Sequence, residues 1–109
     1  MGAQVHFAIL HCNETDDATE DECVLRFNNI QFWNGPMKGG RDSNTDTFMV
    51  FPDNQTEAKV SLIDQDWPTD DFIGTHVIRR DELGQGWHRA HFKNEDADYH
   101  LDYEVFNAL

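Results

Sequence analysis

The sequence predicts an all-β protein, an antiparallel β-sandwich of about seven to eight strands. Helical periodicity is hard to find, whereas alternation of apolar and polar residues with period two recurs along the chain. Short apolar runs are separated by segments rich in Gly, Pro, Asn and Asp, which favour turns. The 109 residues are enough for one domain with a real core but not for two, so we expect a single domain over residues 1–109.

The elements follow from these patterns in chain order. Six strands with irregular alternation are expected at about 5–12, 23–32, 47–51, 58–63, 72–79 and 86–93. They are separated by the turn-rich segments DDATED, NGPMKGGRDSN, PDNQT, DWPTDD, DELGQG and NEDAD. Residues 35–44 contain three glycines and predict a mobile surface loop. The last strand is the clearest, because apolar residues alternate with polar ones at Tyr99, Leu101, Tyr103 and Val105. Short strands joined by polar turns are typical of a sandwich.

The charge balance limits the partners. The chain has 21 acidic and 8 basic residues, a formal net charge of -13, yet its eight Phe, three Trp and two Tyr indicate a folded protein. Such an acidic surface repels phosphates, which argues against nucleic-acid binding and favours cations as partners. Solubility alone is the competing explanation for much of the charge.

The opening residues MGAQVHFAIL lack the features of a signal peptide, and no apolar run approaches the ~20 residues of a membrane helix. We therefore expect a cytoplasmic or membrane-peripheral protein. Cys12 and Cys23 are two cysteines that could be bonded or free, and their number does not decide between these states.

The segment DQDWPTDDFIG, residues 64–74, concentrates four carboxylates beside a tryptophan. Asp64 and Asp66 are two positions apart, so on an extended strand their side chains point to the same side. Asp70 or Asp71 returns after the turn at 67–69, and Phe72 to Gly74 then begin a buried strand. Carboxylates 4 Å apart repel by about 1 kcal/mol in water. Calcium, which accepts six to eight oxygen ligands, would remove this repulsion.

A second acidic segment, NETDDATEDE at residues 13–22, lies between the first two expected strands. Its carboxylates are Glu14, Asp16, Asp17, Asp21 and Glu22. Loops of a sandwich gather at its two ends, so both acidic segments can share one end and hold one or two ions. The competing interpretation is a pair of solvated acidic turns.

Other metal sites fit the sequence less well. An EF-hand beginning at Asp64 would need a glycine where Thr69 stands and a glutamate where Thr75 stands. Zinc is disfavoured because oxygen ligands dominate and the cysteines are not in a paired motif. His88 and His91 are three positions apart on an expected strand and therefore face opposite sides. No hydrolase motif is recognisable, so we expect no enzymatic activity.

The stretches VSLIDQDWPTDDFIGTHVI and ADYHLDYEV resemble the C-terminal half of a C2 domain. The match covers residues 58–105 well and the first half loosely. The resemblance implies a C2-like sandwich in which Asp64, Asp66 and Asp71 bind calcium beside Asp70. In the first half, Asp16 or Asp17 would fill one ligand position and Asp21 another, the latter without the proline usual in the family. Trp67 and Pro68 would form the loop tip, which can enter a membrane in calcium-dependent C2 domains.

The leading hypothesis is therefore a non-enzymatic, calcium-binding C2-like module. Loops 13–22 and 64–71 would hold the ion, which could switch docking to a phospholipid membrane or a protein. Trp67 would contact the partner in this case, or would instead pack against the sandwich. The alternative is a calcium-independent sandwich that binds protein or glycan, with residues 35–44 as a candidate surface. A small hydrolase is a third hypothesis.

Overall fold

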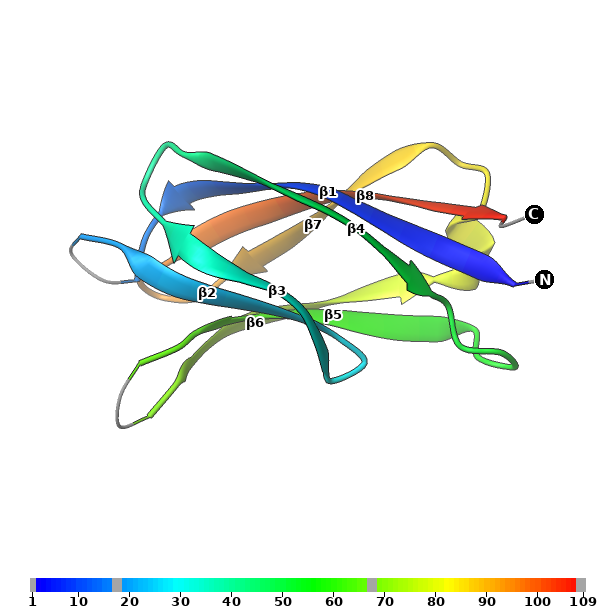
Figure 1. The fold of residues 1–109 in the computed structure, drawn as a ribbon, viewed down its shortest axis with the longest axis horizontal. Coiled ribbons are helices and arrows are strands. Elements are labelled where there is room, and N and C mark those ends of the chain that lie inside the picture. Colours follow the sequence, from blue (N-terminus) through cyan, green and yellow to red (C-terminus); the bar gives the residue numbers. More distant parts are fainter. Residues whose placement is uncertain (1, 17–18, 67–68, 108–109) are drawn as a thin grey trace.

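The computed structural model describes residues 2–16, 19–66 and 69–107. Its strands are β1 (Ala3–Glu14), β2 (Asp21–Phe27), β3 (Ile30–Met37), β4 (Asp42–Val50), β5 (Glu57–Asp64), β6 (Asp71–Arg79), β7 (Trp87–Lys93) and β8 (Asp98–Asn107), with a short 3-10 helix η1 (Arg80–Glu82) before β7. They form two antiparallel four-stranded sheets, ordered β4-β1-β8-β7 and β3-β2-β5-β6. Figure 1 shows the two sheets as facing layers. The predicted antiparallel β-sandwich is confirmed.

The core lies between the sheets. Strand β8 alternates as predicted, with its odd-numbered residues from Tyr99 to Val105 buried. Phe7 of β1 reaches across to the other sheet, where its ring stacks on Phe32 of β3 with centroids 4.5 Å apart. It also meets Phe27 of β2 edge to face at 5.7 Å. Aromatic contacts of this kind add to the hydrophobic burial that holds the two layers together.

Two expectations for the first half were wrong. The predicted strand at 23–32 is two strands, because Asn28 and Asn29 both adopt positive φ (48° and 68°) and form a two-residue hairpin turn. Asparagine tolerates this left-handed conformation better than most residues, and such turns join antiparallel strands tightly. The predicted mobile loop at 35–44 is mostly strand, since β3 continues to Met37 and β4 begins at Asp42. Gly35 belongs to β3, where a Cβ atom would meet the ring of Trp33 at 2.8 Å.

The expectation that a buried strand begins at Phe72 was wrong for this residue, because β6 contains a β-bulge next to it. The register of β5 with β6 shifts between Leu62, which pairs with Gly74, and Ile63, which pairs with Phe72. One extra residue in a strand moves its neighbours to the other face of the sheet. Ile73 is consequently buried, whereas the Phe72 side chain is 59% exposed.

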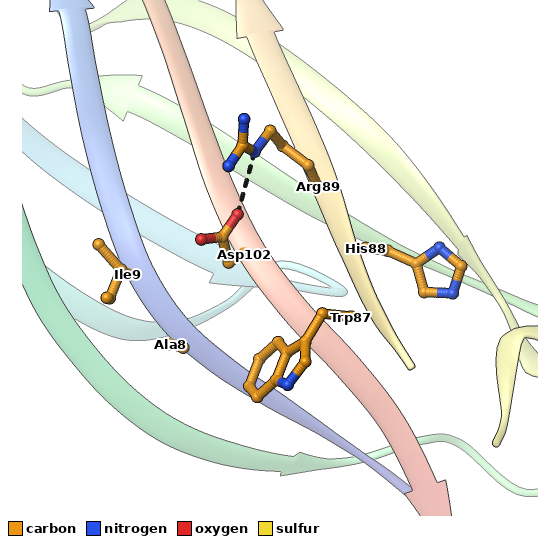
Figure 2. A pocket seen from close by; sticks show the side chains of 6 residues that line it. All are labelled: Ala8, Ile9, Trp87, His88, Arg89 and Asp102. Atoms are coloured by element: carbon orange, nitrogen blue, oxygen red, sulfur yellow. Dashed lines mark hydrogen bonds and ion pairs between the residues drawn. The ribbon is translucent and has the colours of Figure 1, made fainter. Parts of the chain in front are cut away.

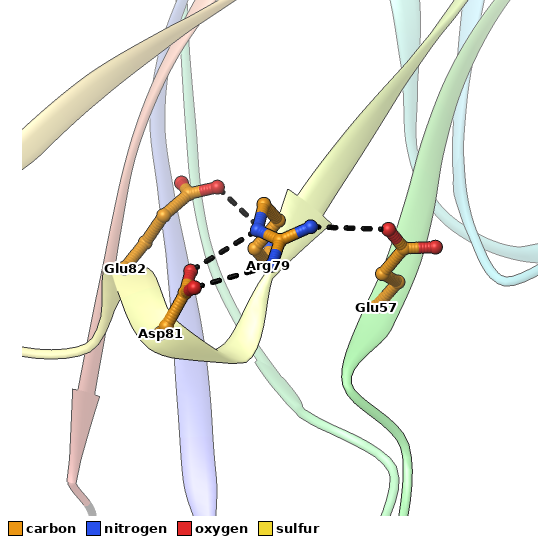
Figure 3. Close-up of polar contacts among 4 residues, drawn as sticks. All are labelled: Glu57, Arg79, Asp81 and Glu82. Carbon is orange, nitrogen blue, oxygen red and sulfur yellow. Dashed lines mark hydrogen bonds and ion pairs between the residues drawn. The ribbon is translucent and has the colours of Figure 1, made fainter.

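The connections divide between the two ends of the sandwich. The loops β1–β2, β5–β6 and β7–β8 lie at one end, and both termini and η1 lie at the other (Figure 1). At the η1 end, the Arg79 guanidinium donates to both oxygens of Asp81 at 3.2 Å and to Glu57 at 3.4 Å (Figure 3). Its backbone N–H donates to Glu82 at 2.9 Å, which closes the turn after β6. These ion pairs are exposed and so contribute little to stability.

Candidate metal centre

The site begins where β5 ends and β6 starts. Asp64 is the last residue of β5, Asp71 is the first of β6, and the two are cross-strand partners. Residues directly opposite each other on antiparallel strands have Cβ atoms about 4.5–5.5 Å apart, so this register places the two carboxylates together. Asp64 is fully buried, whereas Asp71 is exposed. Asp66 follows in the loop and is half-buried.

Strand β2 fixes the orientation of Asp64. Its residue Cys23 pairs with Asp64 across the β2–β5 ladder. The N–H of Glu22 donates to Asp64 Oδ1 at 2.9 Å, and the N–H of Gln65 donates to the Glu22 carbonyl at 2.7 Å. A backbone donor to a buried carboxylate makes a charge-assisted hydrogen bond, which is among the stronger kinds. The first turn of the β5–β6 loop is therefore attached to the start of β2.

The β1–β2 loop supplies a fourth carboxylate. One oxygen from each of Asp16, Asp64, Asp66 and Asp71 lies within 4.8 Å of the other three. Two ligands on one calcium ion, each 2.3–2.6 Å from it, are at most about 4.6–5.2 Å apart. The span of this group, which we call the acidic cluster, therefore fits the reach of a calcium ion. Its hard carboxylate oxygens also match the ligand preference of calcium rather than that of zinc.

Asp21 lies behind the acidic cluster rather than within it. Its carboxylate is fully buried, and Oδ2 accepts hydrogen bonds from the Asp16 N–H at 2.7 Å and from the Tyr99 hydroxyl at 2.5 Å. Burial, and then the bond to Asp21, raise the pKa of the Tyr99 phenol, which therefore stays protonated and continues to donate. Asp21 thus connects the β1–β2 loop to the core strand β8.

Two cysteine thiols lie close to the Tyr99 hydroxyl. Cys12 and Cys23 are free and buried. Burial is the main cause that raises the pKa of Cys12, and it raises the pKa of Cys23 to about 12. Since the thiolate is the reactive form, burial lowers the reactivity of both cysteines.

The remaining predicted site residues have different positions. Asp70 is exposed and lies outside the acidic cluster. Asp17, Trp67 and Pro68 fall outside the described residues. The proposed roles of Asp70 and Asp21 as ligands stay predictions, and the structure gives each a definite place at which they can be tested.

Sequence reasoning missed the third loop at this end. A groove of about 330 Å³ adjoins the acidic cluster and is lined by Asp16, Asp71, Phe72, Asn94, Glu95 and Asp96. Asn94 organises the β7–β8 turn, because its side-chain oxygen accepts from the N–H groups of Asp96 and Ala97 at 2.9 and 2.7 Å. The composition of NEDAD predicts a turn, but its position beside the first two acidic loops depends on the strand order. Phe72 adds an exposed aromatic ring at the rim.

A second buried tyrosine makes a related contact near η1. The Tyr103 hydroxyl donates to Glu82 at 2.5 Å and contacts His76 Nε2 at 2.9 Å. The ring of His88 stacks on Tyr103 with centroids 5.6 Å apart. The expectation that His88 and His91 face opposite sides is confirmed, since His88 points toward this group and His91 is exposed.

Comparison with solved structures supports the class of fold. A structure described as a C2 domain matches 94% of this chain and 96% of its own, with a TM-score of 0.64 and 13% identity. A structure of two C2 domains of extended-synaptotagmin 2 matches 95% of this chain with a TM-score of 0.54 and 18% identity. Human GIVD cytosolic phospholipase A2, determined with an inhibitor and terbium chloride, matches 97% with a TM-score of 0.57 and 14% identity.

The chain spans 39% of the extended-synaptotagmin chain and 17% of the phospholipase chain. No family model and no curated protein sequence matches it. The fold is therefore that of a C2-like sandwich, as the sequence resemblance implied, and it carries a group of nearby carboxylates at one end. Across residues 2–16, 19–66 and 69–107, no helix has the length and apolar character needed to cross a membrane.

Proposed function

We propose that this protein is a calcium-binding C2-like module whose acidic cluster takes up one or two ions. The observation that carries the proposal is the approach of four aspartates from two loops to within 4.8 Å. Calcium would supply the positive charge that offsets their mutual repulsion. Asp64, held by the Glu22 N–H, would be the fixed ligand. Asp16, Asp66 and Asp71 would complete the oxygen set from the more exposed side.

The same geometry supports a calcium-dependent switch. Without a cation, the acidic end repels an anionic membrane or an acidic partner. With the charge neutralised, the exposed Phe72 can make apolar contacts with a membrane. Trp67, which belongs to the same acidic segment in the sequence, is a second proposed contact. One of the solved structures with a similar fold is a cytosolic phospholipase A2, an enzyme named for a phospholipid substrate, which supports the proposal of a phospholipid partner.

Calorimetric titration of chelator-treated protein with calcium tests the proposal. The wild type should release or absorb heat on binding, and its melting temperature should rise because an ion that binds only the folded state adds about 2.7 kcal/mol at 100 times its Kd. The Asp64→Asn plus Asp66→Asn variant should lose both effects. Asp53→Asn plus Glu57→Gln is the matched control, because these residues lie away from the acidic cluster and the change in charge is the same. Absence of heat and of a melting shift in millimolar calcium would contradict the proposal.

Vesicle co-sedimentation separates docking from simple ion binding. Wild-type protein should pellet with anionic phospholipid vesicles in calcium and stay in solution with chelator. Phe72→Ala and Trp67→Ala should weaken pelleting while leaving the calcium heat unchanged. Equal pelleting of both variants and the wild type would remove the membrane part of the proposal and leave ion binding intact.

A second candidate function, calcium-independent recognition of a protein or glycan, has one observation in its favour. A groove of about 540 Å³ lies along β1, β7 and β8 and is lined by Ala8, Ile9, Trp87, His88, Arg89 and Asp102. Figure 2 shows the Trp87 ring beside the Arg89–Asp102 ion pair, whose atoms are 3.1 Å apart. An exposed aromatic ring next to fixed polar groups is common at binding surfaces. Ligand binding that is lost in Trp87→Ala and unaffected by chelator would favour this function.

A further inference from the structure

Three histidines lie side by side across the outer face of the β4-β1-β8-β7 sheet. His100 of β8 is the direct cross-strand partner of His11 on β1 and of His91 on β7. All three belong to the polar positions that alternate with buried residues, so they share one face of the sheet. His88 and His91 face opposite sides of β7 and so cannot bind the same ion. The order of the strands instead brings His91 beside His100 and His11. We call His11, His100 and His91 the histidine row.

The strand register of the histidine row places three imidazoles within reach of one metal ion. Their ring nitrogens do not converge in this structure, since among the described residues the ligand-atom group within 4.8 Å is the acidic cluster, so binding requires the rings to turn. The rings of His11 and His100 stack with centroids 4.8 Å apart. Directly opposed residues on neighbouring strands have Cβ atoms about 4.5–5.5 Å apart, so rotation of the rings can bring nitrogens from adjacent positions onto one ion. The strand ladders hold the three Cα positions rigidly, which reduces the entropy lost on chelation.

Carboxylates flank the row at both ends in the way that metal-binding histidines require. His11 Nδ1 is hydrogen-bonded to Asp42 of β4, and His91 Nε2 to Asp98 of β8 at 2.5 Å. A histidine that ligates a metal through one ring nitrogen usually gives the other to a carboxylate, which fixes the ring and raises its basicity. His11 Nε2 contacts the exposed Asn13 side chain at 2.9 Å, which can be displaced.

The charge of the chain also favours cation binding. Its formal net charge of -13 concentrates cations near the surface.

We infer that the histidine row is a binding site for a borderline-soft divalent cation such as zinc, separate from the acidic cluster. Three imidazoles with an open fourth position are one of the ligand sets that zinc adopts. Calcium prefers oxygen ligands, so the two sites are expected to select different ions.

Zinc titration of chelator-treated protein, by calorimetry in millimolar calcium, tests the inference. The wild type should bind one zinc ion, and His100→Gln should weaken binding at least tenfold because it removes the central ligand. His6→Gln is the matched control, since His6 lies on the same face of β1 but stacks on Phe48 outside the row. Unchanged zinc affinity in His100→Gln, or an equal loss in His6→Gln, would overturn the inference.

The Asp64→Asn plus Asp66→Asn variant distinguishes the two proposed sites. It should keep wild-type zinc affinity, whereas loss of zinc binding in this variant would place the ion at the acidic cluster and overturn the inference. Imidazole proton NMR gives a direct readout: zinc should shift the resonances of His11, His91 and His100 and leave those of His6 in place. Failure of calcium binding in the earlier titration would not affect any of these outcomes.

Discussion

The two buried tyrosines of β8 offer a matched pair of perturbations. Tyr99 and Tyr103 lie four residues apart on the same inward face, and each hydroxyl donates to a carboxylate at 2.5 Å. Tyr99 donates to Asp21 beside the acidic cluster, whereas Tyr103 donates to Glu82 near η1. Tyr99→Phe and Tyr103→Phe therefore remove the same kind of bond at opposite ends of the molecule.

The expected cost of Tyr99→Phe follows from the burial of its acceptor. Asp21 is fully buried, and a hydrogen bond to a charged group contributes about 1.5–3 kcal/mol to stability. For a domain of this size, 1 kcal/mol corresponds to about 4 °C in melting temperature. We therefore expect Tyr99→Phe to melt about 6–12 °C below the wild type in thermal denaturation followed by circular dichroism. Tyr103→Phe should fall by less, because part of the Glu82 side chain reaches solvent.

Calcium affinity distinguishes the two variants further. Asp21 Oδ2 accepts from both the Tyr99 hydroxyl and the Asp16 N–H, so loss of the hydroxyl loosens the carboxylate that positions Asp16. We expect the calcium Kd of Tyr99→Phe to rise about three- to tenfold, which corresponds to about 0.6–1.4 kcal/mol. Tyr103→Phe should bind calcium like the wild type. A melting shift of less than about 2 °C for Tyr99→Phe, or equal calcium affinities in the two variants, would refute this reasoning.

Three further predictions concern packing and pH. Gly74→Ala should lower the free energy of unfolding by about 1–3 kcal/mol in urea denaturation, because its Cβ would meet backbone atoms of Phe92 and Lys93 at 3.2 and 3.3 Å; Gly39→Ala, with an ordinary 3.7 Å contact, should change little. Phe7→Ala should remove about 3–5 kcal/mol in the same assay, since its buried ring bridges the two sheets; a loss below about 1 kcal/mol would argue against the core described above. Burial lowers the pKa of His76 below its usual 6.5, so the folded state favours the neutral ring and this contribution to stability is present above pH 6.5 and lost as the pH falls through the folded pKa. His76→Gln should therefore lose less stability than the wild type between about pH 7.5 and 5.5 in urea denaturation, and parallel losses would contradict this assignment.

The sandwich and the aspartates of the 64–71 segment could be predicted from the sequence because they depend on local patterns. Alternation in β8 reports burial directly, and Asp64 and Asp66, two positions apart, lie at the end of β5 and in the loop that follows it. The β2–β3 hairpin was missed because its turn consists of Asn28 and Asn29 without glycine or proline. The exposure of Phe72 was missed because a bulge in β6 changes which residues of the strand point inward. A single extra residue is hard to recognise in the alternation of apolar and polar residues.

Features that depend on the order of strands in the sheets could not be predicted from the sequence. Of the described acidic residues Asp16 and Asp21, the start of β2 decides which one joins the acidic cluster, since Asp21 belongs to the strand and turns inward while Asp16 stays in the loop. The histidine row was invisible for the same reason. His11 is far along the chain from His91 and His100, and only the β4-β1-β8-β7 order makes their strands neighbours.

The arrangement of donors behind the acidic cluster explains how the fold holds its buried carboxylates. Asp64 and Asp21 take hydrogen bonds from two backbone N–H groups and from the Tyr99 hydroxyl, all placed by strand pairing and core packing. Burying a charge is costly unless it is hydrogen-bonded, and these donors offset that cost. The carboxylates of Asp16, Asp66 and Asp71 lie nearer to solvent, where water screens their repulsion. The hydrogen-bonded carboxylates of Asp64 and Asp21 are therefore held in place by the sheets, whereas the other three can move. If calcium binds, it should order the loops that carry these three aspartates and leave the sheets unchanged.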